Sequence, residues 1–423
     1  MRFLKKLSLL FLILFLSGLH AQVSQSSASL EELYRSANSN YPLIKDATLI
    51  DKIEEVGLAV ISKNALPKLT LEGRGQIQSE NIELNLGTTS IQAPLETWNT
   101  SLNIDYNLYD GGNTKAQKNI ETASANVDRN SLEVQLRSLK DQVNTLLFAI
   151  LLSRKQKLIF ENSKEDLESN IRTLQAAYEN GTALESEVSK LKVRQLELVS
   201  EIVAVEGDMA TYFLLLEQLT GKTLPRDVQF KIPGLLELDT NTVNRPENLL
   251  YDSQKTLFAA QEASVAASTL PKISLFAQGG VGNPNQLNFS DLNTAAYALG
   301  GVKLNWNFID FGKGKKERKR LQLQQEQVEV ERELFLFDIE SKSKEYQERI
   351  KATQQQIVND TEIVDLQKNI LAQTKVQLDN GVINATDYVT QLNATLNSEQ
   401  ELEFNKIQLQ QLQIEYLTLL GQL

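Results

Sequence analysis

The sequence predicts a mostly α-helical protein with a smaller β part, built from a duplicated unit of helix, β-hairpin and long helical hairpin. Three observations predict this fold. A seven-residue apolar repeat marks long helices, and stretches of about ten residues that alternate apolar and polar side chains mark strands. The same order of features then occurs in both halves of the chain.

The longest predicted element is a helix over residues 113–180, which is followed by a turn at Asn180–Gly181 and a return helix over 183–220. No proline or glycine interrupts residues 113–180. At about 1.5 Å per residue the helix would be roughly 100 Å long. A seven-residue repeat held over this length is typical of helices that supercoil around partners. The repeat falls on Leu132, Leu139, Leu146, Ser153, Phe160, Leu167 and Leu174.

The features of the first half recur 200 residues later, where Asn180–Gly181 is matched by Asn380–Gly381 and Gly221 by Gly421. Ordered matches along both halves indicate an internal duplication. We predict a signal peptide over residues 1–21, a first repeat over 22–221, a linker over 222–246 and a second repeat over 247–423. In the first repeat we expect strands at 67–79 and 98–109 and helices at 113–180 and 183–220. In the second repeat we expect strands at 271–282 and 297–309 and helices at 314–380 and 384–420.

The N-terminal residues have the pattern of an export signal. Arg2, Lys5 and Lys6 precede a short apolar run over 7–16 and a predicted cleavage point after Ala21. The run is too short to cross a membrane as a helix, which takes ~20 apolar residues. The mature chain is therefore expected to be exported.

Composition argues against several classes of function. The signal carries three basic residues and no acid, so its removal takes the net charge from −11 to −14. A chain this acidic is not expected to bind nucleic acid. The chain has no cysteine, and its one histidine, His20, lies in the signal. The mature chain thus lacks the commonest general base and the usual transition-metal ligands, and we expect no enzyme activity, cofactor or metal site.

Each repeat contains two predicted strands with one apolar and one polar face. Leu102 and Ile104 share an apolar face with Asn103 opposite, and Leu304 and Trp306 share the apolar face in the second repeat. This alternation is typical of transmembrane barrel strands, and equally of a soluble sheet with one wet face. Four strands cannot close a barrel, and open edges do not survive in lipid. A membrane location therefore predicts that several chains share one barrel.

The long helices need cover along their apolar seams. We expect the helix over 113–180 to pair with its return helix and with 247–270, and the helix over 314–380 to pair with the last helix and the helix that starts at Leu30. The second long helix opens with a basic cluster, made of Lys315, Lys316, Arg318, Lys319 and Arg320. Such a cluster is usually a solvated face, but below membrane strands it would lie near lipid phosphates.

These features together resemble the TolC-like outer-membrane efflux protein family. The resemblance covers essentially the whole mature chain and rests on the order and spacing of several short marks. These are Pro67 and Pro271 before the hairpins, Tyr109-Asp110-Gly111-Gly112 and Ile309-Asp310-Phe311-Gly312 after them, the two Asn-Gly turns, and Gly221 and Gly421. The resemblance implies a homotrimer in which each chain gives four strands to a 12-stranded transmembrane β-barrel above an α-helical periplasmic tunnel. It places the chain in the outer membrane of a Gram-negative-type bacterium.

The same resemblance implies an exit channel of a tripartite efflux or type I secretion system. The channel would dock to a periplasmic adaptor (membrane fusion) protein and an inner-membrane pump of the RND, ABC or MFS type. Its adaptor-docking tips would be Asn180, Gly181, Thr182, Asn380, Gly381 and Val382. Its periplasmic constriction would involve Glu187 and Asp387, with Thr390 where one member has a second acid. That member closes its gate with a tyrosine and an arginine, whose positions here are Leu378 and Ile383, so this gate must be held differently.

A periplasmic coiled-coil scaffold or adaptor protein without a pore is the alternative function. It would explain the long helices but would leave four alternating strands without a role. Cell fractionation separates the two hypotheses, because a scaffold is released by osmotic shock whereas a barrel stays with the outer membrane.

Overall fold

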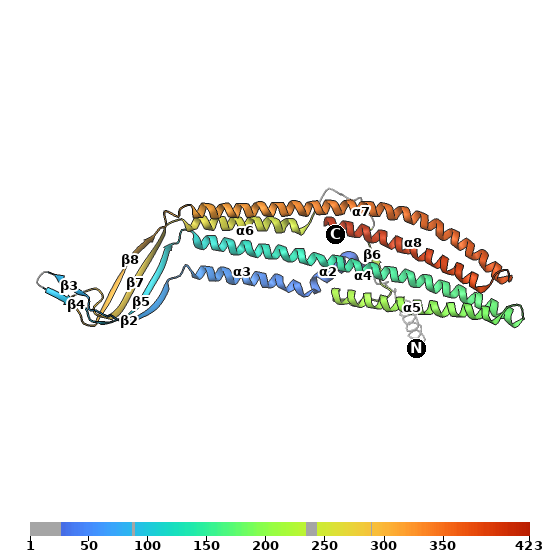
Figure 1. Ribbon diagram of the computed structural model, residues 1–423, viewed down its shortest axis with the longest axis horizontal. Coiled ribbons are helices and arrows are strands. Elements are labelled where there is room, and N and C mark those ends of the chain that lie inside the picture. Colours follow the sequence, from blue (N-terminus) through green and yellow to red (C-terminus); the bar gives the residue numbers. More distant parts are fainter. Residues whose placement is uncertain (1–26, 87–88, 234–242, 289) are drawn as a thin grey trace, which may run out of the picture. The chain divides into compact units, whose positions relative to one another are not determined.

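The computed structural model describes residues 27–86, 89–233, 243–288 and 290–423. The predicted signal peptide lies outside these residues. The chain divides into two compact units. The first unit consists of Met1–Tyr41, Ser138–Val243 and Ser343–Leu423, and the second consists of Pro42–Arg137 and Asn244–Lys342. Two long helices, α4 (Asn113–Glu179) and α7 (Lys313–Asp379), contribute to both units (Figure 1).

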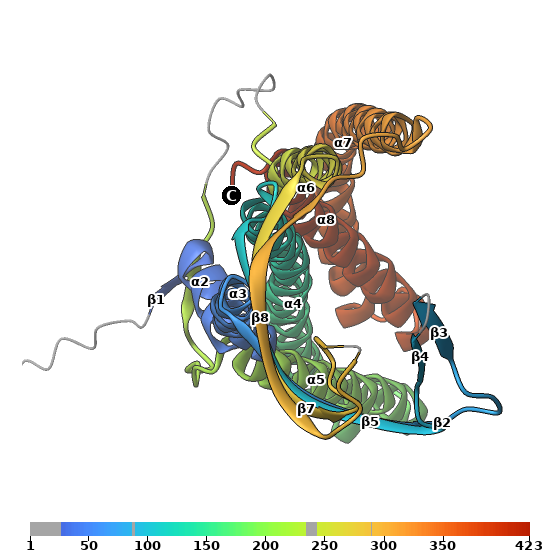
Figure 2. The same ribbon diagram turned by 90° about the vertical axis from the view of Figure 1, so that its left-hand side faces the viewer.

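The second unit contains a four-stranded antiparallel sheet in the order β2-β5-β7-β8 (Figure 2). Its strands are β2 (Lys68–Ile77), β5 (Glu96–Tyr109), β7 (Lys272–Asn283) and β8 (Ala295–Asn305). Pro67 and Pro271 precede β2 and β7, where a missing N–H and a fixed φ favour a switch from helix to strand. Two short strands, β3 (Glu83–Leu86) and β4 (Thr89–Gln92), pair antiparallel between β2 and β5, in a stretch where the sequence predicts no strand.

The register of the sheet separates apolar from polar side chains. Leu71, Leu102, Gly279 and Ala298 lie opposite one another across the four strands, so they share one face. One pair away, Asn103 lies opposite Gln278 on the other face. On that polar face Ser101 Oγ accepts a hydrogen bond from Gln278 Nε2 (3.0 Å). The predicted phase of Leu102, Ile104 and Leu304 agrees with this register.

Two details of the sheet differ from the sequence prediction. The last strand was expected to reach residue 309, but β8 ends at Asn305, so Trp306 lies outside the ladder and is not a strand residue. Its indole Nε1 instead donates to the Thr269 carbonyl at the end of a neighbouring helix (3.2 Å). The alternation also predicts Leu108 on the apolar face of Leu102 and Ile104, but the pairing of β5 shifts between Asn107 and Tyr109, which leaves Leu108 in a bulge.

Two further helices cover the starts of the long helices in the second unit, and they are α3 (Lys45–Lys63) and α6 (Pro246–Ser268). The predicted pairing is wrong here. α3 packs on α4, where Arg129 Nε donates to Asp51 (2.9 Å), and α6 packs mainly on α7, where Lys255 pairs with Glu329 (2.8 Å). A β-hairpin returns the chain beside the point where it left, so the helices before and after it become neighbours.

The first unit holds the helical hairpin ends and a helical core. The return helices are α5 (Glu185–Thr220) and α8 (Ala385–Leu420), and both have 36 residues, while α4 and α7 both have 67. These equal lengths fit the predicted duplication. The predicted linker is not wholly irregular, because β6 (Gln229–Lys231) within it pairs in parallel with β1 (Ser27–Ser29).

Helix α2 (Leu30–Asn40) closes the core of this unit and leads through a short 3₁₀ turn (Pro42–Ile44) to α3. Ser29 and Glu32 form a capping box at its start, which satisfies two otherwise unpaired N–H groups. Tyr34 donates to the buried Asn144 Oδ1 on α4 (2.5 Å), and Asn144 Nδ2 donates to Thr418 on α8 (3.4 Å). This polar network links three helices inside an otherwise apolar cluster.

We predict that Tyr34→Phe destabilises the helical core. The change leaves the fully buried Asn144 Oδ1 without the hydroxyl donor, and an unsatisfied buried acceptor costs about 1–3 kcal/mol. The measurement is thermal unfolding followed by far-ultraviolet circular dichroism. Tyr178→Phe is the control, because Tyr178 is exposed; equal melting temperatures for both variants would contradict the prediction.

Candidate functional site

The ends of the two helical hairpins have the same backbone geometry. Gly181 and Gly381 adopt φ of +77° and +70°, the left-handed conformation that favours glycine. Gly181 N donates to Tyr178 O (2.9 Å) and Thr182 N to Ala177 O (2.9 Å), and the same pair of bonds closes the second tip. These bonds satisfy carbonyls at the helix ends, so each tip is a compact turn rather than a loose loop.

All six predicted tip residues are exposed. The Asn180 and Asn380 side chains fold back and donate to the carbonyls of Ala176 (2.9 Å) and Val376 (2.7 Å). Val382 on the second tip and Leu184 just after the first tip are large apolar side chains that are open to solvent. Each tip is therefore a hydrogen-bonded turn with an exposed apolar side chain on it or just after it.

Glu187 and Asp387 occupy matching positions in the two repeats but have different surroundings. Glu187 Oε2 accepts from the Ala385 backbone N–H at the start of α8 (2.5 Å), and Glu187 Oε1 pairs with Lys190 (2.8 Å). The hydrogen bond from Lys190, followed by that from Ala385, lowers the pKa of Glu187 despite partial burial. Glu187 thus caps the helix of the other repeat, which is favourable because a carboxylate there also meets the positive end of the helix dipole.

Asp387 stays exposed on the first turn of α8. Its backbone N–H donates to Asn384 Oδ1 (3.1 Å), which is the side-chain cap of this helix. Thr390 lies three residues later and is also exposed, so the two side chains are neighbours on the helix surface. Among the described residues, no ion pair involves Asp387. Of the two acids, Asp387 is the one whose carboxylate stays exposed to solvent.

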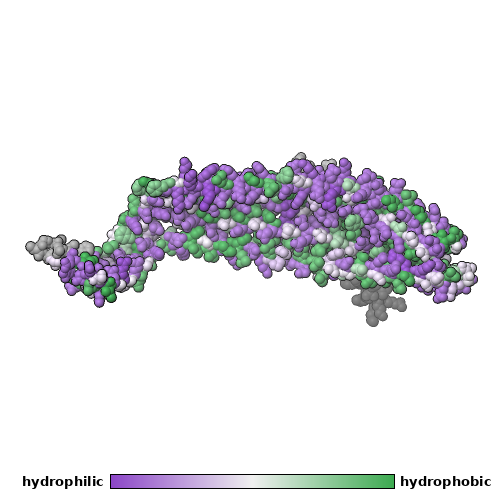
Figure 3. All heavy atoms as spheres, in the orientation of Figure 1, coloured by the Kyte–Doolittle hydropathy of each residue, from purple (hydrophilic) through white to green (hydrophobic). Residues whose placement is uncertain are grey.

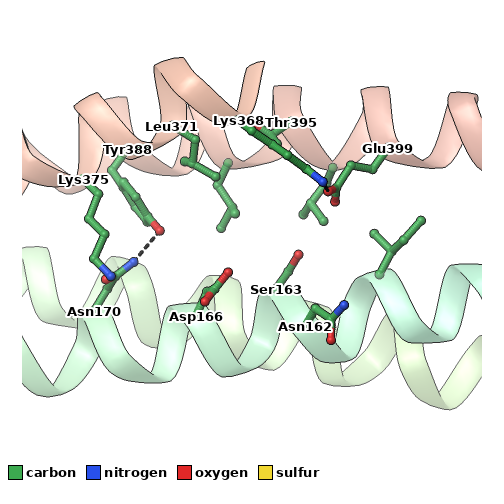
Figure 4. Close-up of a pocket in the computed structure, with 14 residues that line it drawn as sticks. Asn162, Ser163, Asp166, Asn170, Lys368, Leu371, Lys375, Tyr388, Thr395 and Glu399 are labelled. Carbon is green, nitrogen blue, oxygen red and sulfur yellow. Dashed lines mark hydrogen bonds and ion pairs between the residues drawn. The ribbon is translucent and has the colours of Figure 1, made fainter. Parts of the chain in front are cut away.

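A polar contact that the sequence analysis missed joins the two repeats near the tips (Figure 4). Asn170 on α4 donates through Nδ2 to the hydroxyl of Tyr388 on α8. Both side chains are almost fully buried, and burial raises the pKa of Tyr388 to about 12, so the hydroxyl stays protonated. They line a cavity of about 480 Å³, in which Lys368 also pairs with Glu399 (2.7 Å). Neither residue falls on the seven-residue repeat, so periodicity gave no signal for them.

The two gate positions inferred from the resemblance are apolar core here. Leu378 is buried beside Tyr388, and Ile383 packs against the same cluster. Tyr178, the tyrosine of the first repeat, is exposed. Near the tips, Asn170–Tyr388 and Glu187–Ala385 are polar links between the repeats, and they lie at positions other than Leu378 and Ile383.

Comparison with known proteins gives a family match and a fold match. Residues 33–222 match the family model described as outer membrane efflux protein. The first repeat is therefore similar to outer membrane efflux proteins. The match spans α2 to the end of α5 and includes the Gly181 tip. A search of curated proteins finds no match to this chain.

Solved channel structures extend the structural similarity to nearly the whole chain. The structure of CusC has a TM-score of 0.69 at 16% identity, covering 92% of this chain and 91% of that one. VceC from Vibrio cholerae has a TM-score of 0.65 at 14% identity, covering 93% and 96%. The Campylobacter jejuni channel CmeC has a TM-score of 0.64 at 14% identity, covering 96% and 90%. At these identities the likeness shows the fold, which confirms the predicted fold class of helices with a β part.

None of the helices that the structure describes combines the length and the hydrophobicity needed to span a bilayer.

We predict that Glu187→Ala frays the start of α8. Loss of the charged acceptor should speed exchange of the Ala385 amide about tenfold, since such hydrogen bonds are worth about 1.5–3 kcal/mol when buried and less when partly exposed. Because the folded-state pKa of Glu187 lies below its ordinary 4.5, protection in the wild type should hold above that pH and fall as the pH drops through the lowered pKa.

Hydrogen exchange read by mass spectrometry at several pH values measures this effect. Glu185→Ala is the control, because Glu185 is exposed on the same turn as Glu187. Unchanged exchange at Ala385 in Glu187→Ala, or an equal change in the control, would rule out the cap.

Proposed function

We propose that this protein is the outer-membrane exit channel of a tripartite efflux or type I secretion system. Three copies would each give four strands to a shared 12-stranded barrel, and their helices would form a tunnel through the periplasm. The channel would be a conduit without catalytic chemistry. Its partners would be a periplasmic adaptor (membrane fusion) protein and an inner-membrane pump of the RND, ABC or MFS type.

The observation that carries the proposal is the two-faced sheet with open edges. Among the described residues, no strand pairs with the outer edge of β2 or of β8. Four antiparallel strands make β2 and β8 run in opposite directions, so β8 of one copy can pair with β2 of the next and keep the alternation. Closure removes the unpaired N–H and C=O groups that lipid does not tolerate.

The apolar face of the sheet supports a place in the membrane. The strands have 10 to 14 residues, which suffices for tilted transmembrane strands of about 9–11 residues. Small and large apolar side chains make up most of this face, and they are Leu69, Leu71, Gly73, Gly75, Trp98, Leu102, Ile104, Ile273, Leu275, Ala277, Gly279, Val281, Ala296, Ala298, Gly300, Val302 and Leu304. The soluble scaffold would leave this whole face in water.

The tips at Gly181 and Gly381 are the surfaces we assign to adaptor docking. They are exposed, closed by their own hydrogen bonds and nearly identical in backbone geometry, so one kind of partner can engage both. We assign Asp387 to the narrowest part of the entrance, with Thr390 beside it, and Glu187 to the contact that holds the two repeats together. The gate would then be held by Asn170–Tyr388 and Glu187–Ala385.

Reconstitution in planar bilayers tests the function. We expect the purified wild type to be a detergent-resistant trimer that conducts ions. Leu102→Arg should abolish assembly, because Arg facing lipid at mid-depth costs about 2–4 kcal/mol per chain. Asn103→Arg should still conduct, because Asn103 lies on the polar face. A folded wild-type monomer without conductance would support the scaffold instead, and equal damage from both variants would contradict the assigned faces.

We predict that Asp387→Asn weakens the cation preference of the channel. Three exposed carboxylates around one axis would attract cations and repel anions, whereas Glu187 is already engaged by Lys190 and Ala385. Single-channel recording of reversal potentials, with and without a multivalent cation on the periplasmic side, measures the change. Glu187→Gln is the matched control and should keep both the preference and the block. A preference lost in the control but kept in Asp387→Asn would reverse the assignment.

A further inference from the structure

A surface patch at the junction between β8 and α7 has no role in the function described above. We define the junction patch as Trp306, Phe308, Phe311, Lys315, Lys316 and Arg320. Trp306, Phe308 and Phe311 are 54%, 73% and 97% exposed, and the three cations are exposed as well. The junction lies at the end of the sheet from which the helices of the same unit leave (Figure 1). In Figure 3, hydrophobic surface extends over this junction and hydrophilic surface follows along α7.

Phe311 is held in an unfavourable backbone conformation. Its φ is +52°, and the first repeat has Gly111 with φ +71° at the matching position. A side chain with a Cβ resists this left-handed conformation. Because Phe311 is almost fully exposed, packing within the chain does not offset the strain. The bulky aromatic side chain therefore has a use outside the chain that a glycine would not serve.

The cations of the patch lie where the helix dipole and the neighbouring positive charges disfavour them. Residues 313–320 contain six basic side chains and one acid, whereas residues 113–120 of the first repeat contain two lysines. Cations at a helix N-terminus oppose the dipole, and like charges four apart, as in Lys315 and Lys319, repel one another. Among the described residues, no ion pair involves Lys315, Lys316 or Arg320, whereas Lys319 pairs with Glu326 (3.6 Å).

The aromatic and cationic parts of the patch meet in a cleft of about 350 Å³, which is lined by Trp306, Phe308, Lys315 and Arg318 among others. Asp310 also borders it, but its two oxygens accept from Gly312 N (2.9 Å) and Gly314 N (2.8 Å). Asp310 thus serves as the cap of α7. The cations beyond it are left to an external anion.

We propose that the junction patch binds the headgroups of anionic phospholipids in the leaflet that faces the helices. This inference rests on the proposed function, which puts the sheet in a bilayer. The apolar face ends at Leu304, so the aromatic residues follow at the level where Trp and other aromatic side chains prefer the membrane interface. The cations of α7 come next along the chain, at the depth of the lipid phosphates.

The chemistry favours a lipid over a soluble anion. A free phosphate would need the cations but not three exposed aromatic side chains continuous with an apolar face. A membrane uses both, because aromatic rings insert at the interface while Lys and Arg attract anionic headgroups. Each cation near an anionic surface is worth roughly a fivefold gain in binding. Removing three should lower the preference for anionic lipid at least tenfold.

Native mass spectrometry of the full-length trimer in detergent with equal amounts of phosphatidylglycerol and phosphatidylethanolamine tests the proposal. The variant Lys315→Gln/Lys316→Gln/Arg320→Gln should lose the wild-type preference for bound phosphatidylglycerol by at least tenfold. The charge-matched control Lys45→Gln/Lys342→Gln/Lys351→Gln removes three exposed lysines away from the junction and should keep it. An unchanged preference in the first variant, or an equal loss in the control, overturns the proposal.

Phe311→Gly supplies a second test, in which a loss of lipid binding can be separated from a loss of the fold. It restores the residue type of the first repeat, so the melting temperature in detergent should stay equal or rise, while the number of bound phospholipids falls. A lower melting temperature would make Phe311 a structural residue and contradict its role at the interface.

Added inorganic phosphate should not displace phosphatidylglycerol; displacement would identify a phosphate site and overturn the assignment to lipid. A wild type that conducts in bilayers but binds both lipids equally would refute this inference alone, whereas a wild type without conductance would refute the proposed function.

Discussion

The constraint on which the rest of this structure depends is the pairing of backbone groups at the edges of the sheet. β2 and β8 each carry a row of N–H and C=O groups that no described strand satisfies. In water such edges invite aggregation, and in lipid they are not tolerated. If the apolar face lies in lipid, as we propose, the edges have to be paired by other copies. The match of residues 33–222 to the outer membrane efflux protein model and the fold shared with solved channels agree with that requirement.

The duplication gives each residue of the first repeat a matching position in the second. Where the two positions differ in residue type or surroundings, the two repeats can have different roles. The acid after each tip illustrates this, because Glu187 is used inside the chain as a cap whereas Asp387 is left exposed. The turn after each β-hairpin is a second example. Both turns have a residue with positive φ, which is a glycine in the first repeat (Gly111) and the less favourable Phe311 in the second. An exact repeat would place both acids and both turns in equivalent surroundings. The pore entrance and the membrane contact that we propose would each need features on one surface only, and departures from the repeat supply such features.

The sequence revealed what is periodic and local, and missed what is long-range. The seven-residue repeat and the apolar–polar alternation predicted the long helices and the faces of Leu102 and Asn103, because each periodicity follows from helix or strand geometry. The Glu187–Ala385 and Asn170–Tyr388 bonds join residues 198 and 218 positions apart, and no periodicity encodes them. Contacts between distant residues also explain why the predicted helix pairing was wrong. They explain the error at Trp306 as well, whose indole N–H bonds to the Thr269 carbonyl outside the sheet.

The long helices lead to the same requirement as the strand edges. On α4 the seam is covered within the chain, as the buried Leu132, Leu139 and Leu167 show. On α7 a stripe with helical spacing is more than half exposed, and it consists of Leu323, Val330, Leu334 and Phe337. Fully burying such side chains is worth about 1.5–3 kcal/mol each, so half-exposed ones leave several kcal/mol for a neighbouring helix to supply. This stripe and the open edges of β2 and β8 belong to the same compact unit, so a single association of copies can cover the helices and close the sheet together.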